Sequence, residues 1–273
     1  MPVSFEAFTA GAVPALLALP DHPRRCPLVV FVPGYGAVKE VGLGLAYRLA
    51  QRGMASVSFD PVGHGERQDD LLDRAHEPAL GGIYPPETGL DIYFNFLRVI
   101  ASCPKDIRTL LDHLSADARV DVTRAGVTGH SQGSYASFLA LADIPELQAA
   151  VPMMGVPTFT ERLQDLLDET AWSNAEWGRA LAAVAEQTAE RVATVRRFDP
   201  GSRLLQPPPR PLLAMNGDFD SDQPKSYTLN WLRVLRPLYA GKEDRLRWNV
   251  YPVGHVMTEE MMADAVEWFE RWL

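Results

Sequence analysis

The chain has 273 residues, 47% of them apolar and 22% charged, and its formal net charge is −9. This length and composition fit one large globular domain with a sizeable core. The negative charge, without any long Lys/Arg-rich run, argues against a nucleic-acid partner and against binding to anionic membranes.

Apolar runs of strand length predict eight strands along the chain. The first two, at 5–9 and 13–19, read as an antiparallel pair joined near Gly11. The other strands are expected at 28–32, 54–59, 124–128, 149–154, 211–215 and 246–251, and helices at 41–51, 105–114, 134–142 and 258–273. Because strands alternate with helices, the sequence predicts an α/β fold with a mostly parallel sheet and helices on both faces.

Two segments, 68–98 and 157–209, do not fit this repeating unit. The second is mostly helical in pattern and ends in Pro207-Pro208-Pro209, a stiff connector. It is inserted between two strands at the carboxyl edge of the predicted sheet. We therefore expect a single domain over residues 1–273, with a helical lid inserted at about 157–209.

The stretch Gly129-His130-Ser131-Gln132-Gly133 lies between a predicted strand and a predicted helix. A strand, a G-x-S-x-G turn and a helix form a nucleophile elbow, in which a sharp turn exposes the serine at the helix N-terminus. Glycines on both sides let strand and helix pack closely without Cβ clashes. The pattern predicts Ser131 as a nucleophile, with an ordinary turn serine as the alternative.

A serine hydroxyl needs a base within hydrogen-bond reach, and the base needs a third group that fixes its tautomer. Active sites of parallel sheets lie beyond the carboxyl ends of the strands, and His255 directly follows the last predicted strand. His64 also follows a strand, but it precedes the serine, whereas the expected order is serine, acid, histidine. We interpret His64 as a loop-shaping residue, with pocket lining as the alternative. His130 is a poor base because adjacent side chains in the elbow diverge.

The acid is expected in the loop after the strand at 211–215, where three aspartates alternate. We favour Asp220, with Asp218 and Asp222 as alternatives. A further reading is that all three are turn residues that bind their own backbone.

A developing oxyanion needs two preorganised N–H donors. One is expected to be the backbone N–H of Gln132, directly after the nucleophile. The other is expected in the loop Pro33-Gly34-Tyr35-Gly36, which follows a buried strand. We favour the N–H of Tyr35 for this role, and Pro33 has no N–H to donate. The alternative is that Gly34 and Gly36 only form a simple turn.

Four landmarks in this order resemble the α/β-hydrolase superfamily, over nearly the whole chain apart from 68–98 and 157–209. They are Pro33-Gly34-Tyr35-Gly36, Gly63-His64-Gly65, the Gly129 to Gly133 elbow and Gly254-His255. Gly34-Tyr35-Gly36 and the stretch from Gly126 to Gly133 are similar to the dienelactone-hydrolase-like and acetyl xylan esterase-like branches. This resemblance implies an α/β-hydrolase fold and the hydrolysis of carboxylic esters with acetyl or other short acyl groups. Ser131 stands where true dienelactone hydrolases have a cysteine, and Pro33 where a histidine is usual.

The expected function is that of a serine carboxylesterase acting on small, short-acyl esters through an acyl-enzyme on Ser131. One alternative is a serine peptidase of the prolyl oligopeptidase type, although those enzymes usually carry a large extra domain that we do not see here. Another is a non-catalytic binding module on a hydrolase scaffold. Met153, Met154, Trp172 and Trp177 are expected to line an apolar pocket, unless the tryptophans only pack the lid onto the core.

No cofactor and no metal site are expected. Cys26 and Cys103 lack the C-x-x-C spacing of a structural zinc site, so reduced thiols are favoured over a long-range disulfide. The apolar stretch 12–19 is too short to span a bilayer and contains Pro14. We expect a cytoplasmic protein whose partner is a small-molecule ester, and the sequence leaves self-association open.

Overall fold

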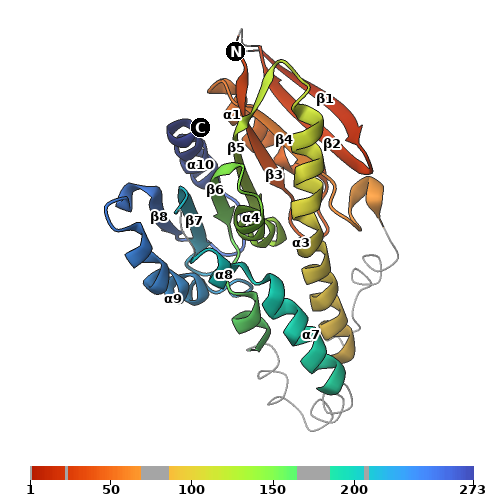
Figure 1. The fold of residues 1–273 in the computed structure, drawn as a ribbon, viewed down its shortest axis with the longest axis vertical. Coiled ribbons are helices and arrows are strands. Elements are labelled where there is room, and N and C mark those ends of the chain that lie inside the picture. Colours follow the sequence, from red (N-terminus) through yellow and green to blue (C-terminus); the bar gives the residue numbers. More distant parts are fainter. Residues whose placement is uncertain (1, 22–23, 69–85, 165–184, 206–208) are drawn as a thin grey trace.

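The fold is built around one eight-stranded sheet, as the sequence predicts (Figure 1). The computed structural model describes residues 2–21, 24–68, 86–164, 185–205 and 209–273. The strands are β1 (Val3–Ala10), β2 (Val13–Pro20), β3 (Cys26–Val32), β4 (Ala55–Phe59), β5 (Val120–His130), β6 (Leu147–Met153), β7 (Leu212–Gly217) and β8 (Leu246–Tyr251). All eight predicted strands are therefore present.

The strand order in the sheet is β1-β2-β4-β3-β5-β6-β7-β8. β2 pairs antiparallel with both β1 and β4, and every other pairing is parallel. The loops that leave β3, β4, β5, β7 and β8 therefore emerge at the same edge of the sheet. In such a sheet, ligands bind at this carboxyl edge.

Helices cover both faces of the sheet. They are α1 (Leu43–Gln51), α3 (Pro86–Leu114), α4 (Gln132–Asp143), α7 (Ala185–Phe198), α8 (Pro200–Arg203), α9 (Lys225–Leu235) and α10 (Glu259–Trp272), with short 3₁₀ turns η1 (Lys39–Gly42), η2 (Gly65–Arg67), η4 (Arg236–Tyr239) and η5 (Glu243–Arg245). The larger hydrophobic cluster joins one face of the sheet to α3, α4 and α9, and the smaller one joins the other face to α1 and α10. The confirmed architecture is that of an α/β-hydrolase.

β3 shows how the sequence produces these two layers. Its apolar side chains alternate between the clusters, with Leu28, Val30 and Val32 in the larger one and Val29 and Phe31 in the smaller one. Successive side chains of a strand point to opposite faces, so a strand covered on both faces needs an unbroken apolar run. This is why the strand is recognisable from hydrophobicity alone.

The helix expected at 105–114 is much longer than predicted. α3 begins at Pro86 and has 29 residues, with Pro104 in its interior. Proline removes a helix hydrogen bond and usually ends a helix, so the pattern suggests a start at Lys105. Buried Leu97, Ile100 and Cys103 nevertheless continue the apolar face of the helix toward its N-terminus. The predicted excursion at 68–98 is therefore helical from Pro86 onward, and residues 69–85 lie outside the described part.

The insertion expected at 157–209 contains α7 and α8, between β6 and β7. Phe159, Leu163 and Val195 are buried in the larger cluster. Figure 1 shows α7 alongside the N-terminal half of α3, beyond the edge of the sheet. Residues 165–184 and 206–208 lie outside the described residues, so the role of this insertion as a lid stays a prediction.

None of the described helices combines the length and the apolar character that a membrane crossing needs.

Candidate active site

The elbow is a tight turn between β5 and α4 in which one residue occupies an uncommon backbone region. Ser131 has φ 56° and ψ −117°, between His130 at the end of β5 and Gln132 at the start of α4. Such conformations cost about 1–3 kcal/mol and persist only where the surroundings enforce them. Here the N–H of Ser131 donates to the carbonyl of Met153 at the end of β6, at 2.9 Å.

Two glycines make this turn possible. A Cβ on Gly129 would lie 2.4 Å from the carbonyl oxygen of Gly133, and a Cβ on Gly133 would lie 1.9 Å from the carbonyl oxygen of Val32. Neither contact can be relieved by turning a side chain, because the obstructing atoms belong to the backbone. The G-x-S-x-G spacing thus follows from the close packing of α4 against β3 and β5.

Three predicted residues form one hydrogen-bonded chain. His255 Nε2 lies 2.8 Å from the hydroxyl oxygen of Ser131, and His255 Nδ1 lies 2.8 Å from Asp220 Oδ2. The Asp220 side chain is fully buried, while that of His255 is 23% exposed. Because a carboxylate oxygen can only accept, Nδ1 carries the proton and Nε2 is left to accept from the serine hydroxyl.

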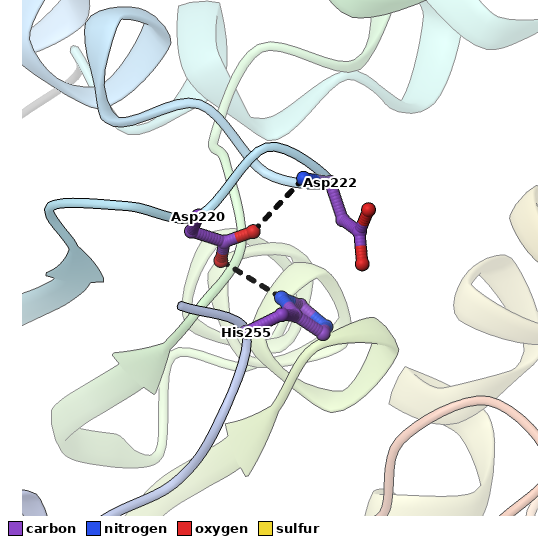
Figure 2. A group of neighbouring side chains, drawn as sticks. All are labelled: Asp220, Asp222 and His255. Atoms are coloured by element: carbon purple, nitrogen blue, oxygen red, sulfur yellow. Dashed lines mark hydrogen bonds and ion pairs between the residues drawn. The ribbon is translucent and has the colours of Figure 1, made fainter. Parts of the chain in front are cut away.

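The three aspartates after β7 have different partners. Asp220 Oδ1 accepts from the backbone N–H groups of Asp222 and Gln223, at 3.0 and 2.9 Å, and this fixes its other oxygen on His255. Figure 2 shows the bond from Asp222 and the bond to His255. Asp218 pairs with Lys225, and Asp222 is exposed beside the histidine. Of the three, Asp220 is the one that meets His255.

Asp220, Asp222 and His255 also bring three potential metal-ligating atoms within 4.8 Å of one another. Both ring nitrogens of His255 are already engaged in hydrogen bonds, one with Asp220 and one with Ser131. A metal ion bound here would have to displace one of these bonds. The arrangement suits proton transfer better than metal coordination.

The expected oxyanion donors lie beside the elbow. Gln132 is the first residue of α4, and the first N–H groups of a helix have no partner within it. A Cβ on Gly34 would lie 3.3 Å from the carbonyl oxygen of His130 and 3.6 Å from the Cβ of Ser131. The loop that carries Tyr35 therefore runs directly past the nucleophile.

His130 packs against His255 instead of approaching the serine, with the ring centroids 5.2 Å apart. Burial, reinforced by the neighbouring His255 and opposed by Asp220, lowers the pKa of His130 to about 4. His130 is thus neutral near pH 7 and adds no positive charge beside His255.

The structure describes two of the four predicted pocket residues, Met153 and Met154. Met153 and Met154 have no exposed surface and belong to the smaller core cluster, so their role in a substrate pocket stays a prediction. Trp172 and Trp177 lie outside the described residues.

One support of the site has no recognisable signal in the sequence. The hydroxyl of Tyr135, one turn into α4, donates to the side chain of Gln223 in the loop of the acid. The rings of Phe96 and Phe159 pack on Tyr135, with centroids 5.2 and 5.1 Å away. The elbow helix therefore also holds the loop that presents Asp220.

Comparison with known proteins gives the family. The family model described as "Prolyl oligopeptidase family" matches residues 101–273, which is more than half of the chain. The chain belongs to the prolyl oligopeptidase family. The matched part includes the elbow and the loops that carry Asp220 and His255, whereas Tyr35 lies before it.

Similarity to individual proteins extends over the whole length of this prolyl oligopeptidase family member. A Bacillus subtilis (strain 168) protein named "Putative esterase YitV" is 26% identical over 277 residues, covering 99% of this chain and all of that relative. The crystal structure of TT1662 from Thermus thermophilus has a TM-score of 0.72 at 21% identity, covering 100% of this chain and 98% of that one. Acetyl Xylan Esterase 1 from Thermoanaerobacterium sp. JW/SL YS485 has a TM-score of 0.63 at 18% identity, with 98% and 87% covered. The resemblance expected from the sequence is confirmed.

Proposed function

We propose that the protein is a serine esterase that hydrolyses small carboxylic esters through an acyl-enzyme on Ser131. The observation that carries this proposal is the chain of two 2.8 Å hydrogen bonds from Ser131 through His255 to Asp220. A full-length relative that bears an esterase name, and an acetyl xylan esterase of the same fold, support an ester as substrate.

In the first half of the reaction, His255 Nε2 takes the proton of Ser131 as its oxygen attacks the ester carbonyl. The tetrahedral oxyanion accepts hydrogen bonds from the backbone N–H groups of Tyr35 and Gln132, and the positive end of the α4 dipole adds to this stabilisation. His255 then gives its proton to the departing alcohol.

In the second half, water takes the place of the alcohol and the same groups act again. His255 draws a proton from the water, whose oxygen attacks the acyl carbonyl on Ser131. His255 then returns this proton to the Ser131 oxygen as the acyl–oxygen bond breaks and the carboxylic acid leaves. Asp220 holds the tautomer of His255 and stabilises its charged form during both halves. Its burial and its two backbone N–H donors keep the carboxylate in one orientation.

We further propose that the acyl group is short, such as acetyl. The support is the similarity of the Gly34–Gly36 and Gly126–Gly133 stretches to esterase branches that act on short acyl groups. In this proposal the segment 157–209 is a lid on a single domain, and Met153, Met154, Trp172 and Trp177 contribute apolar surface around the substrate.

A second candidate is peptidase activity, because the matching family is that of prolyl oligopeptidase. The same serine, histidine and aspartate can attack an amide as well as an ester. An amide needs a protonated leaving amine, so it places a stricter demand on the position of His255 than an activated ester does.

A substrate panel tests these proposals. We expect the protein to hydrolyse p-nitrophenyl acetate, and to hydrolyse p-nitrophenyl esters of longer acyl chains progressively more slowly. We also expect no cleavage of aminoacyl p-nitroanilides and covalent labelling of Ser131 by a fluorophosphonate. The Ser131→Ala variant should fold as the wild type does and lose both turnover and labelling. Amide cleavage would favour the peptidase, and an unlabelled, inert wild type would favour a binding module. Ester turnover that survives in Ser131→Ala would refute the nucleophile.

A further inference from the structure

The loop that follows β4 carries a buried histidine that the proposed reaction does not use directly. Within the loop 60–68, the N–H of His64 donates to the carbonyl of Pro61 at 3.0 Å, and the carbonyl of His64 accepts from the N–H of Arg67 at 2.8 Å. The residue is 1% exposed. These bonds fix the backbone of His64 and leave its ring little freedom.

Both ring nitrogens of His64 bind backbone groups. Nδ1 lies 3.0 Å from the carbonyl oxygen of Val62, and Nε2 accepts from the N–H of Gly36 at 3.0 Å. A carbonyl only accepts and an N–H only donates, so both bonds form together only when Nδ1 is protonated and Nε2 is not. The partner of Nε2, Gly36, directly follows Tyr35.

Gly36 belongs to a turn whose geometry depends on one peptide plane. The N–H of Ala37 donates to the carbonyl of Gly34 at 3.1 Å, and Gly36 has φ 73°. These are features of a type II turn with Tyr35 and Gly36 at its centre. A type I turn differs mainly by a flip of the peptide between these two central residues, which changes ψ of the first and φ of the second. The N–H of that peptide is the group that His64 holds.

We propose that His64 is a positioning residue: by binding the Gly36 N–H it holds the turn in one conformation, and the turn in this conformation keeps the preceding Gly34–Tyr35 peptide, with the N–H of Tyr35, aimed at the oxyanion. The inference rests on the proposed function, because it assigns a role to the oxyanion hole of that reaction. In this proposal His64 acts through the Tyr35–Gly36 peptide.

The first residue of the same loop, Asp60, is held by separate bonds. Asp60 accepts from the backbone N–H of Lys39 with one carboxylate oxygen and from the Lys39 ammonium with the other, both at 2.8 Å. Asp60 is completely buried. Loss of the His64 bond therefore leaves the loop attached at Lys39 and loosens only the turn around Tyr35.

Two substitutions of His64 separate its hydrogen bond from its bulk. His64→Phe keeps a ring beside Tyr35 but cannot accept from Gly36, and His64→Gln offers a carbonyl oxygen in a similar place. Loss of a whole oxyanion donor costs on the order of 10²–10³ in kcat, so a misaligned donor should cost less. We expect kcat to fall about 10- to 100-fold in His64→Phe with KM changed less than about 3-fold, and His64→Gln to recover much of this loss.

The matched control removes a different support of the same loop. Arg67 of this loop pairs with Asp106 of α3 at 2.6 Å, and the Asp106 side chain is 8% exposed. Asp106→Asn should lower the melting temperature yet leave kcat within about 3-fold of wild type, because the bond from Gly36 to His64 remains. A loss of kcat in Asp106→Asn equal to that in His64→Phe would mean general loop damage and would overturn the proposal.

An inhibitor that forms an oxyanion gives a readout that a purely structural role would not move. A trifluoromethyl ketone adds to the serine and places a charged oxygen in the oxyanion hole. We expect its inhibition constant to rise in His64→Phe by the same factor by which kcat/KM falls. An unchanged inhibition constant, or unchanged kcat, would overturn the role of His64.

The two proposals fail separately. Activity in Ser131→Ala refutes the serine esterase mechanism itself. If Ser131→Ala is inactive but His64→Phe is as active as the wild type, only the role of His64 is refuted. If His64→Phe does not fold, ¹⁵N–¹H spectra of the wild-type imidazole decide. A proton on Nδ1 of His64 supports the bond to Gly36, and a proton on Nε2 overturns it.

Discussion

Replacement of Asp220 by asparagine should inactivate the protein by inverting the histidine tautomer. Asp220 Oδ1 accepts two backbone N–H bonds, from Asp222 and Gln223, and Oδ2 accepts one from His255. An asparagine with its side-chain oxygen toward the two N–H groups preserves two hydrogen bonds of about 1 kcal/mol each. This orientation is therefore favoured over the flipped one, which loses both bonds. Its NH₂ group then faces His255 Nδ1 and forces that nitrogen to accept.

The consequence at the other end of the ring can be given a magnitude. With Nδ1 as acceptor, Nε2 carries the proton and points an N–H at the hydroxyl of Ser131, which then has no base. The equivalent change in a serine protease triad lowers kcat about 10⁴-fold, which corresponds to about 5.5 kcal/mol at about 1.4 kcal/mol per factor of ten. We expect a loss of this order in Asp220→Asn, with the fold retained.

The assay is the kcat for p-nitrophenyl acetate, normalised to folded protein by circular dichroism. Asp222→Asn is the matched control, because it keeps the backbone N–H that binds Asp220 and changes only an exposed carboxylate. We expect less than about a 3-fold effect from it. The reasoning is refuted if Asp220→Asn keeps more than about a tenth of wild-type kcat, or if Asp222→Asn is equally impaired.

Two further predictions concern the packing around the elbow. Gly133→Ala should lower the free energy of unfolding by more than about 4 kcal/mol in a urea titration, because the new Cβ would lie 1.9 Å from the Val32 carbonyl. Gly44→Ala is the control: its Cβ meets Met262 at an ordinary 3.8 Å inside α1, so we expect no loss and a gain of up to about 1 kcal/mol. The second prediction is a pH dependence. Because the pKa of His130 is depressed to about 4 in the folded state, the unfolded chain binds the proton more readily. The free energy of unfolding should therefore fall as the pH drops from about 6.5 to about 4. His130→Gln should lose this component, and an equal slope in the variant and the wild type would contradict the assignment.

The sheet could be predicted because its strands are short apolar runs bounded by turn residues. Two helices show where such patterns fail. α3 continues through Pro104, which removes one hydrogen bond that the packing of Leu97 and Ile100 on the core outweighs. α9 was not predicted. It buries Tyr227 and Trp231, aromatic residues with modest helix propensity, so its formation depends on tertiary contacts that a local pattern does not contain.

The site residues differ in the same way: some can be recognised from a local sequence pattern, and others depend on contacts between residues far apart in the sequence. Ser131 stands out because its glycines reflect a steric demand within five residues of sequence. The sequence favours Asp220 over Asp218 but does not establish this choice. The choice depends on how the loop folds to bring its own backbone N–H groups to the Asp220 carboxylate. A bond between His64 and Gly36 joins residues 28 positions apart, and no spacing rule indicates it.

The two strand-end histidines explain why a histidine cannot be assigned as base from its position alone. His255 and His64 each bind an acceptor through Nδ1 and present Nε2 as an acceptor in turn. Their ring chemistry is therefore the same, and the difference lies in what Nε2 meets. In His255 it meets a hydroxyl that can give up its proton, at a side chain 23% exposed to an incoming substrate. In His64 it meets a backbone amide whose proton stays in place, at a residue that is only 1% exposed. The same imidazole can thus transfer a proton at one strand end and hold a peptide plane at another, and the donor opposite Nε2 decides which.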